Sequence, residues 1–249
     1  MPRTISSLLA ATAALLVVAA PAVAQQQNYD TVQVRAEKVT DRLYVLFGAG
    51  GNIALSIGDD GAFIVDDQFA PLNEKIVKAI AALTSKPVRF VVNTHFHGDH
   101  SGGNQAFGRA GATIMAQDNV RKRLGEEQVR GNNRTPPAPR EAMPIVTFSQ
   151  DLSMFVNGDS VHAIYVPNAH TDGDALIHYM GSNAIHMGDT FFAARFPYID
   201  LTSGGSVDGI VQSADRALAI ARDDTKIIPG HGPISTKADL AEYRRVVAT

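Results

Sequence analysis

A dense run of metal-ligating side chains is the feature that most constrains this chain. Three histidines and one aspartate lie within six residues, in His95-Phe96-His97-Gly98-Asp99-His100. The run directly follows Val88–Val92, a short, largely apolar segment typical of a strand buried on both faces. Polar groups are costly to place against a core unless something binds them. The pattern therefore predicts a metal-binding loop at the C-terminal end of a buried strand.

The same arrangement recurs at three later strand ends. His170 follows the predicted strand 164–166, Asp189 follows 184–187, and His231 follows 225–228. Each of these residues lies in a loop marked by glycine or proline, where the chain can turn sharply. A single histidine in such a place is a weak signal, but four strand ends that each offer a ligand are a strong one. Together with the first run, they predict a site built from seven side chains.

The chain contains no cysteine. This excludes disulfides, a thiolate nucleophile and thiolate metal ligands. Metal binding must therefore use imidazole and carboxylate, a combination that suits zinc, manganese or iron.

The order of the predicted elements indicates an α+β fold. Strands are predicted at residues 43–47, 52–57, 62–65, 88–92, 113–116, 154–156, 160–166, 175–180, 184–187 and 225–228. Helices are predicted from Pro71, near Asn104, from Asp118, over 207–221 and from Lys237. In both halves of the chain, strands first meander and then alternate with helices. This pattern predicts two mixed sheets packed together with helices on both outer faces.

The N-terminal residues are predicted to be a secretory signal peptide. Arg3 provides a positive start, residues 8–20 are almost wholly apolar, and Ala22-Val23-Ala24 is a small-residue cleavage site. Residues 1–24 are therefore assigned to the signal and 25–249 to a single domain, located in the periplasm or secreted. No later apolar run is long enough to span a membrane. Residues 25–36 are polar and are predicted to form a loose arm.

These motifs resemble those of the metallo-β-lactamase superfamily. The resemblance comprises His-x-His-x-Asp-His at 95–100, Asn-Ala-His-Thr at 168–171, Gly-Asp-Thr at 188–190 and Pro-Gly-His-Gly at 229–232. It covers nearly the whole mature chain, in the same order, and implies that family's αββα sandwich. It also implies two zinc ions. His95, His97 and His170 would hold the first, Asp99, His100 and His231 the second, with Asp189 as the carboxylate between them.

The resemblance departs from the best-known β-lactamases of the family in two respects. Some of those enzymes have a cysteine at the second metal, and others have Asp-His without the bridging carboxylate. Asp189 makes the site more similar to the glyoxalase II and lactonase branches. The prediction is a hydrolase in which a hydroxide between two zinc ions attacks the substrate, with Asp99 as the catalytic residue that orients it and shuttles a proton.

The substrate is predicted on thinner grounds. A cyclic amide, specifically a β-lactam, is the first hypothesis, and a lactone, ester or thioester is the alternative. Two other classes stay open: an iron-dependent redox enzyme on the same fold, and a metal-dependent binding protein. The complete set of seven ligands argues against the last, because decayed enzymes usually lose one or more.

The segment 121–143 is predicted to be an irregular insertion, either an active-site lid or a solvated loop. It contains six basic and three acidic residues, which would favour an anionic small-molecule substrate if it lies over the metals. The whole chain has a formal net charge of −3. Nothing in it indicates nucleic-acid binding, which requires a basic stripe.

Other polar residues have two interpretations each. His178 and His186 lie within predicted strands, where a structural role is favoured over metal binding. Asp172 and Asp174 either orient imidazoles or shape the turn after His170. Residues 195–198 (Arg-Phe-Pro-Tyr) either line the substrate entrance or pack as an ordinary loop.

Overall fold

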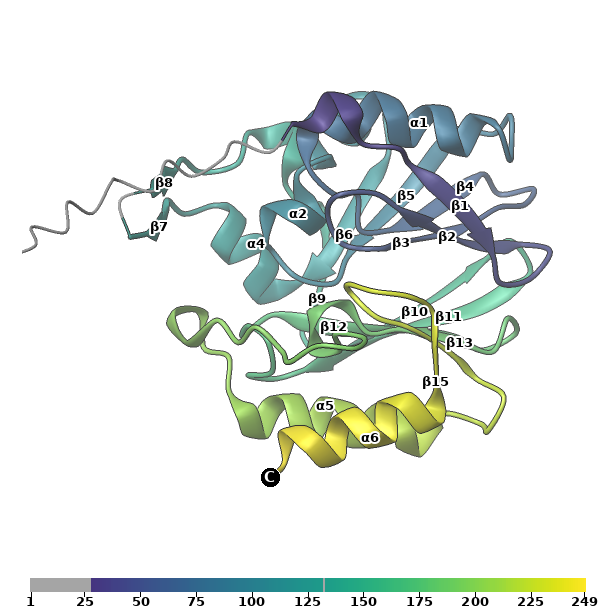
Figure 1. The fold of residues 1–249 in the computed structure, drawn as a ribbon. Helices are drawn as coiled ribbons and strands as arrows, with labels where there is room; N and C mark the ends of the chain where they lie inside the picture. The colour runs from purple at the N-terminus through teal and green to yellow at the C-terminus, as the bar shows by residue number, and fades with distance from the viewer. Residues whose placement is uncertain (1–27, 132) are drawn as a thin grey trace, which may run out of the picture.

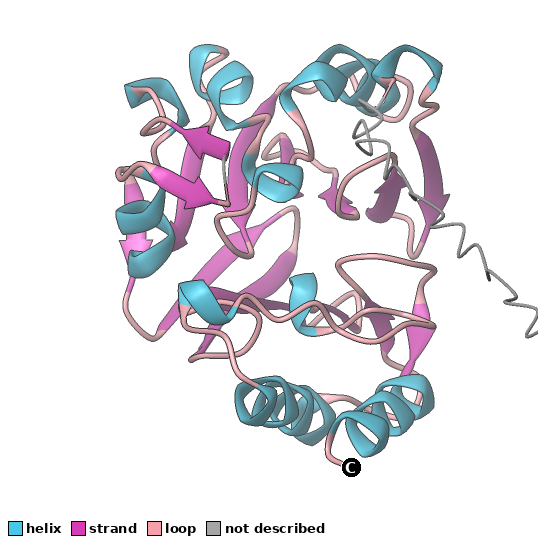
Figure 2. Ribbon diagram, turned by 60° about the vertical axis from the view of Figure 1, so that its left-hand side comes forward, coloured by secondary structure: helices cyan, strands magenta, loops and turns pink. Residues whose placement is uncertain are grey.

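Two β-sheets packed face to face, with helices on both outer faces, form the fold (Figures 1 and 2). The computed structural model describes residues 28–131 and 133–249. The predicted αββα sandwich is confirmed. The predicted signal peptide, residues 1–24, lies outside the described residues. Within those that are described, none of the helices combines the length and the hydropathy needed to cross a bilayer.

The first sheet is mixed and has seven strands. In spatial order these are β1 (Arg35–Lys38), β2 (Leu43–Phe47), β3 (Ile53–Ser56), β4 (Ala62–Val65), β5 (Val88–Asn93), β6 (Thr113–Gln117) and β9 (Val146–Phe148). Strands β1 to β4 form an antiparallel meander, whereas β4, β5, β6 and β9 run parallel. Parallel strands end at the same edge, so the loops after β4, β5 and β6 lie close together.

The second sheet has six strands. In spatial order these are β10 (Asp151–Val156), β11 (Asp159–Val166), β12 (Asp174–Tyr179), β13 (Ala184–His186), β14 (Lys226–Ile228) and β15 (Ser235–Thr236). Asn157 and Gly158 join β10 to β11, and both have positive φ, as a tight hairpin turn requires. Only the β13–β14 pair is parallel.

Helices cover the outer face of each sheet (Figure 1). The α-helices of the described residues are α1 (Asn73–Ala81), α2 (Gly98–Ser101), α3 (Asn104–Arg109), α4 (Asp118–Leu124), α5 (Val207–Ile220) and α6 (Lys237–Val247). Short 3-10 turns are η1 (Tyr29–Thr31), η2 (Ala70–Leu72), η3 (Arg140–Ala142), η4 (Gly188–Thr190) and η5 (Leu201–Ser203). Side chains satisfy the first backbone N–H groups of the two C-terminal helices: Ser206 caps α5, and Thr236 with Asp239 forms a capping box on α6.

The hydrophobic core has three main layers, besides a small fourth cluster in which Val120 of α4 packs on Ala116 of β6 and Phe96. The central layer lies between the sheets and includes Val45, Phe63 and Tyr179, all fully buried. A second layer packs α1 and α3 against the first sheet, and a third packs α5 and α6 against the second sheet. Each sheet is therefore apolar on both faces, which explains the largely apolar strand sequences.

The N-terminal segment is ordered, and the prediction of a loose arm over residues 25–36 was wrong for its described part. Lys75 of α1 donates hydrogen bonds to the carbonyl oxygens of Tyr29, Asp30 and Val32. The Tyr29 ring also packs on Phe69, at 5.3 Å between centroids. Strand β1 then pairs with β2. The sequence pattern missed this because the segment is held by a side chain distant along the chain.

The segment 121–143 is more regular than predicted. It contains the end of α4, a small hairpin of β7 (Gln128–Arg130) and β8 (Asn133–Thr135), and the turn η3. Asn104 of α3 donates a hydrogen bond to the Ala142 carbonyl oxygen, so the end of the segment is fixed to the body of the domain. The hairpin projects from the body (Figure 1).

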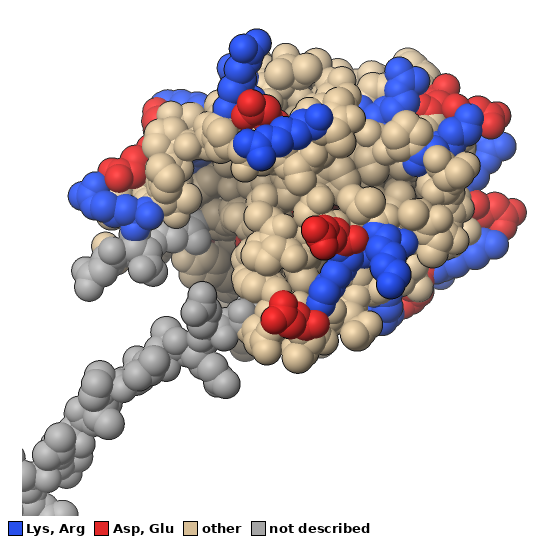
Figure 3. All heavy atoms as spheres, turned by 90° about the horizontal axis from the view of Figure 1, so that it is seen from above, with Lys and Arg blue, Asp and Glu red and all other residues tan. Residues whose placement is uncertain are grey.

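Charged side chains of both signs alternate on the face seen in Figure 3. Lys and Arg lie beside Asp and Glu in small mixed groups on this face, with other residues between the groups. On this face the described residues form no continuous basic stripe.

Candidate metal centre

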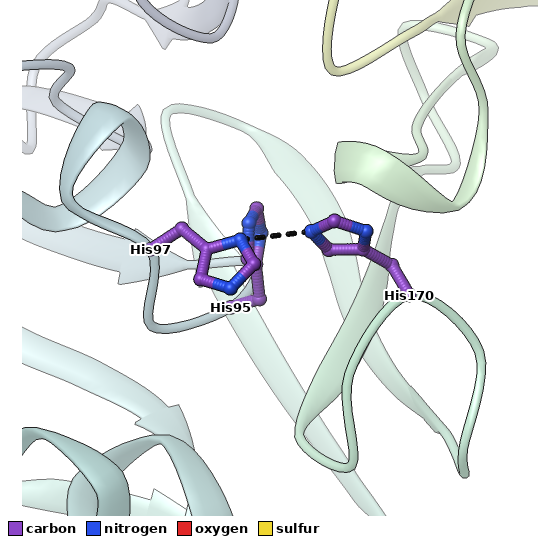
Figure 4. A group of neighbouring side chains, drawn as sticks. All are labelled: His95, His97 and His170. Atoms are coloured by element: carbon purple, nitrogen blue, oxygen red, sulfur yellow. Dashed lines mark hydrogen bonds between the residues drawn. The ribbon is translucent and has the colours of Figure 1, made fainter. Parts of the chain in front are cut away.

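Three buried imidazoles form one group that can hold a metal ion. His95 and His97 come from the loop after β5, and His170 comes from the loop after β11 (Figure 4). One ring nitrogen from each lies within 4.8 Å of the others, and His170 Nε2 is 2.9 Å from His97 Nδ1. His95 Nε2 is buried and has no hydrogen-bond partner among the described residues. A buried nitrogen of this kind, turned toward two others, fits a cation.

The outward-facing nitrogen of each imidazole is held by the protein. His95 Nδ1 contacts Thr94 Oγ1 at 3.1 Å, and Thr94 Oγ1 itself donates to Asp66. Asp200 Oδ2 accepts from His97 Nε2 at 3.0 Å, and the Tyr198 carbonyl oxygen accepts from His170 Nδ1 at 2.7 Å. These contacts place the proton on the outer nitrogen, which leaves the inner nitrogen's lone pair to bind a metal.

A second group lies beside the first and consists of Asp99, His100, Asp189 and His231. His231 Nε2 is 3.2 Å from Asp99 Oδ2 and 3.3 Å from His100 Nε2. The side chains of Asp99 and His231 are 26% and 18% exposed, whereas the other ligand candidates are buried. The second group therefore lies on the side of the site that solvent reaches.

Asp189 lies between the two groups and presents one oxygen to each. Its Oδ2 is 3.5 Å from His170 Nε2 and 4.0 Å from His95 Nε2. Its Oδ1 is 3.0 Å from His100 Nε2 and 3.4 Å from His231 Nε2. A carboxylate in this position can contact two metal ions at once.

Burial and charge shift the pKa values of the site in opposite directions. Burial lowers the pKa of His95 well below its usual value and brings that of His170 to about 4. Burial also acts to lower the pKa of His100, but Asp189, Asp99 and Asp66 raise it well above its usual value. For Asp99, burial acts to raise the pKa, while His100 and His231 bring it to about 2. His95 and His170 are therefore neutral, the form in which imidazole binds metals.

Glycines allow the loops of the site to approach one another. A Cβ on Gly230 would lie 2.0 Å from Asp189 Oδ1, and a Cβ on Gly51 would lie 2.1 Å from the His100 ring. Asn52 holds the loop that contains His231 by donating to the carbonyl oxygens of Pro229 and Gly232. The glycine-rich run 48–51 thus packs directly beneath the second group.

The structure brings all seven predicted ligand residues together, and it adds residues that sequence reasoning missed. Asp66 accepts hydrogen bonds from His100 Nδ1, Thr94 N and Thr94 Oγ1. It directly follows β4, so the rule of a ligand-type residue at a strand end could have found it. Asp200 lies in an irregular loop, and no sequence signal marks its contact with His97. Phe192 stacks on the His231 ring at 5.4 Å and 9°.

The structure places His178, His186 and Asp174, for each of which the sequence left two interpretations open. His186 is buried in β13, where Nε2 donates to the Asn52 carbonyl oxygen and Nδ1 accepts from Gly188 N. His178 is half-buried within β12. Both lie outside the two groups. Asp174 accepts from Thr171 N and Oγ1, and therefore shapes the turn after His170.

Segment 195–198 contacts the site. The Tyr198 carbonyl oxygen holds His170, the Tyr198 ring lies 5.8 Å from the His170 ring, and the Arg195 guanidinium lies 5.0 Å above Phe192.

Comparison with known proteins gives three kinds of match. The sequence profile of the metallo-beta-lactamase superfamily matches residues 49–231. A probable hydroxyacylglutathione hydrolase of Schizosaccharomyces pombe is 27% identical over 197 residues, which is 74% of this chain and 65% of that protein. This chain therefore spans just under two thirds of the length of that relative.

Solved structures share the fold at lower sequence identity. The DIM-1 metallo-beta-lactamase superposes with a TM-score of 0.71 at 21% identity, covering 87% of this chain and 98% of that one. A metallo-beta-lactamase from Pontibacter korlensis gives a TM-score of 0.72 at 17% identity, covering 87% and 100%. The profile match spans the β5 loop and the loops that carry His170, Asp189 and His231. The chain thus belongs to the metallo-beta-lactamase superfamily.

Proposed function

We propose that the protein is a two-zinc hydrolase of carboxylic esters, thioesters or lactones. His95, His97 and His170 would hold one ion, and Asp99, His100 and His231 the other, with Asp189 contacting both. The position of Asp189 is the observation that carries this proposal, because its two oxygens face different groups of imidazoles. Imidazole and carboxylate ligands without thiolate are compatible with zinc.

A pair of zinc ions lowers the pKa of water and polarises a carbonyl group when bound. The protein supplies the groups around this chemistry. Asp99 is the more exposed of the two carboxylates, so it is the one that would orient the attacking water and accept its proton. Asp66 and Asp200 hold His100 and His97 in place from behind. No serine or cysteine nucleophile is required.

The substrate class rests on the ligand set and on the curated relative. The site has a carboxylate between the two groups and no cysteine, and the S. pombe relative bears the name of a hydroxyacylglutathione hydrolase, which acts on a thioester. β-Lactam hydrolysis stays the competing prediction. Its support is a shared fold with metallo-beta-lactamases at about one-fifth identity.

The predicted anionic character of the substrate has limited support in segment 121–143. Arg123 is paired with Asp172 and Arg134 with Glu127, so neither offers an unpaired charge to a ligand. An aromatic side chain also lies beside the site: the Tyr198 ring is 5.8 Å from the His170 ring, and Tyr198 is 55% exposed. A substrate with an apolar or aromatic group beside the scissile carbonyl would fit this surface.

One experiment tests the proposal in two stages. The purified protein is first analysed for bound metals, and two equivalents of zinc per chain are expected. It is then assayed with a hydroxyacyl-glutathione thioester, a simple aryl ester, a lactone, a β-lactam and a phosphoester. Turnover of the thioester, ester or lactone above that of the β-lactam supports the proposal. Preferential turnover of the β-lactam supports the competing prediction.

Variants and chelation separate the proposed site from contaminants. Asp99→Ala should lose activity while it keeps the fold, and a chelator should abolish activity until zinc is restored. His178→Ala is the matched control, because this histidine lies outside both groups. Iron in place of zinc, with no hydrolysis of any substrate, would instead support the redox alternative. A verified two-zinc sample inactive on the whole panel would refute the proposal.

We also propose that the protein is exported, to the periplasm or beyond the cell. The support is the three-part pattern in residues 1–24. Mass analysis of the protein recovered from the extracytoplasmic fraction should show an N-terminus near Gln25. Uncleaved protein retained in the cytoplasm would contradict this.

A further inference from the structure

The three-histidine group depends on the relative position of two distant chain segments. His95 and His97 belong to the first half of the chain, and His170 belongs to the second (Figure 4). His97 and His170 are 73 residues apart in the sequence. A metal held by nitrogens from both segments requires them to stay within a fraction of an ångström of the correct geometry. Whatever fixes one segment against the other therefore affects metal affinity.

One side chain contacts both segments. Arg123, near the end of α4, makes a bidentate ion pair with Asp172, two residues after His170. Its Nε lies 2.8 Å from Oδ1 and its Nη2 lies 2.7 Å from Oδ2. The same guanidinium lies 5.5 Å above the ring of Phe96, the residue between His95 and His97. The planar fork of arginine fixes both distance and angle in such a pair.

The loop that carries Asp172 is fixed to α4 by further contacts. The Asp172 carbonyl oxygen accepts hydrogen bonds from Asn119 Nδ2 at 2.8 Å and from the Tyr165 hydroxyl at 2.9 Å. Gly173 packs so closely on α4 that a Cβ there would lie 3.1 Å from Val120. The Asp172 side chain thus extends from a backbone that is already held, so its carboxylate has little freedom to move.

We propose that Arg123 and Asp172 are positioning residues that set His170 against His95 and His97. The ion pair closes the interface between α4 and the loop after β11, beside Phe96. This inference rests on the proposed metal centre and adds to it. Neither residue belongs to the two groups of candidate ligands.

Electrostatics alone predicts a different result, which makes the proposal testable. Arg123 is a positive charge near a cation site, so its removal should strengthen zinc binding by simple Coulomb interaction. Removal of the negative charge of Asp172 should weaken it. The positioning role predicts instead that both changes weaken binding, because both break the same ion pair between α4 and the loop after β11.

The experiment measures zinc affinity by competition with a chromophoric chelator. The purified protein and the variants Arg123→Met, Arg123→Lys, Asp172→Asn and Arg123→Met/Asp172→Asn are titrated from the metal-free state. Asp172→Asn keeps the backbone contacts with Asn119 and Tyr165. Arg244→Met is the matched control, because Arg244 and Asp215 form a bidentate pair of the same geometry between α6 and α5. Thermal unfolding of each metal-free variant reports whether the fold is retained.

We expect both single variants to weaken one of the two zinc constants by on the order of tenfold. Arg123→Lys should lie between Arg123→Met and the wild type, and the double variant should be no weaker than the weaker single variant. Arg244→Met should bind zinc as the wild type does. Unchanged or tighter zinc binding by Arg123→Met, or fully additive effects in the double variant, would overturn the positioning role. A wild-type protein that binds no zinc would overturn the metal centre itself.

Discussion

Asp66 Oδ2 lies 2.7 Å from Nδ1 of His100, and both side chains are fully buried. The same carboxylate accepts from the backbone and the hydroxyl of Thr94, which in turn contacts His95. One side chain at the end of β4 therefore connects an imidazole of each candidate metal group. Its positive φ of 64° shows that the backbone turns there to direct the carboxylate inward.

Asp66→Asn should weaken zinc binding by about 10- to 100-fold, because a neutral amide holds His100 Nδ1 and the Thr94 hydroxyl less strongly than a carboxylate does. Chelator competition measures the effect. Asp159→Asn is the matched control, since Asp159 accepts two backbone N–H groups in a turn between β12 and β13, outside the candidate groups. Equal zinc affinity in Asp66→Asn and the wild type would contradict the prediction.

Removal of the metals should lower thermal stability. Without metal ions, the side chains of Asp99, Asp189 and the two imidazoles beside them lose the ion that would bind their lone pairs. At free zinc a thousandfold above the dissociation constant, binding contributes about 4 kcal/mol to the free energy of unfolding. For a chain of this size that corresponds to a fall in Tm of roughly 10 °C on chelation. Calorimetry with and without chelator checks this.

The control for that measurement is a His97→Ala variant, which should lose part of the chelator-dependent shift. A wild-type Tm that does not change, in a sample shown to have lost its zinc, would be inconsistent with ligation by buried residues.

Gly230→Ala should disturb the candidate metal site, because Gly230 packs against Asp189. The new methyl group would lie 2.0 Å from Asp189 Oδ1 and 2.6 Å from Gly188 backbone atoms, so the carboxylate must move. We expect a loss of stability of about 1–3 kcal/mol, together with loss of hydrolytic activity. Gly125→Ala is the control, since a Cβ there meets its neighbours at 3.4 Å. Denaturant unfolding and kcat measure the two effects, and wild-type kcat in Gly230→Ala would refute the prediction.

Tyr198→Ala should raise KM and leave zinc binding unchanged. His170 is held by the Tyr198 carbonyl oxygen, which the substitution keeps, whereas the exposed ring is lost. An aromatic contact worth about 1 kcal/mol corresponds to a roughly fivefold rise in KM. Phe155→Ala removes another exposed ring, on β10, and should have no effect. A fall in zinc affinity with KM unchanged would show that the ring acts on the metal site instead.

Much of the fold followed from local patterns. The hairpin at Asn157-Gly158 and the C-terminal helix from Lys237 lie where they were predicted, and the strand predicted over 88–92 extends one residue further, to Asn93. Local patterns were sufficient here because turn chemistry and apolar periodicity act over short distances. The N-terminal segment was mispredicted because Lys75 orders it from more than forty residues away. No local pattern reports such a contact.

The residues of the candidate site also differ in whether a local sequence pattern marks them. The seven candidate ligands lie at strand ends, and the topology of the sheets then brings those ends together. The residues that hold them differ in how they are marked: Asp66 also follows a strand, but Asp200 reaches His97 from an irregular loop over a separation of 103 residues. Only the packed fold brings Asp200 and His97 together.

The division of the ligands between the two halves has a consequence for the order of events during folding. A chain in which only the first sheet has formed offers His95, His97, Asp99 and His100 but none of the remaining three ligands. Tight metal capture must therefore follow the docking of the two sheets. A metal ion bound there would stabilise the finished domain and neither half alone.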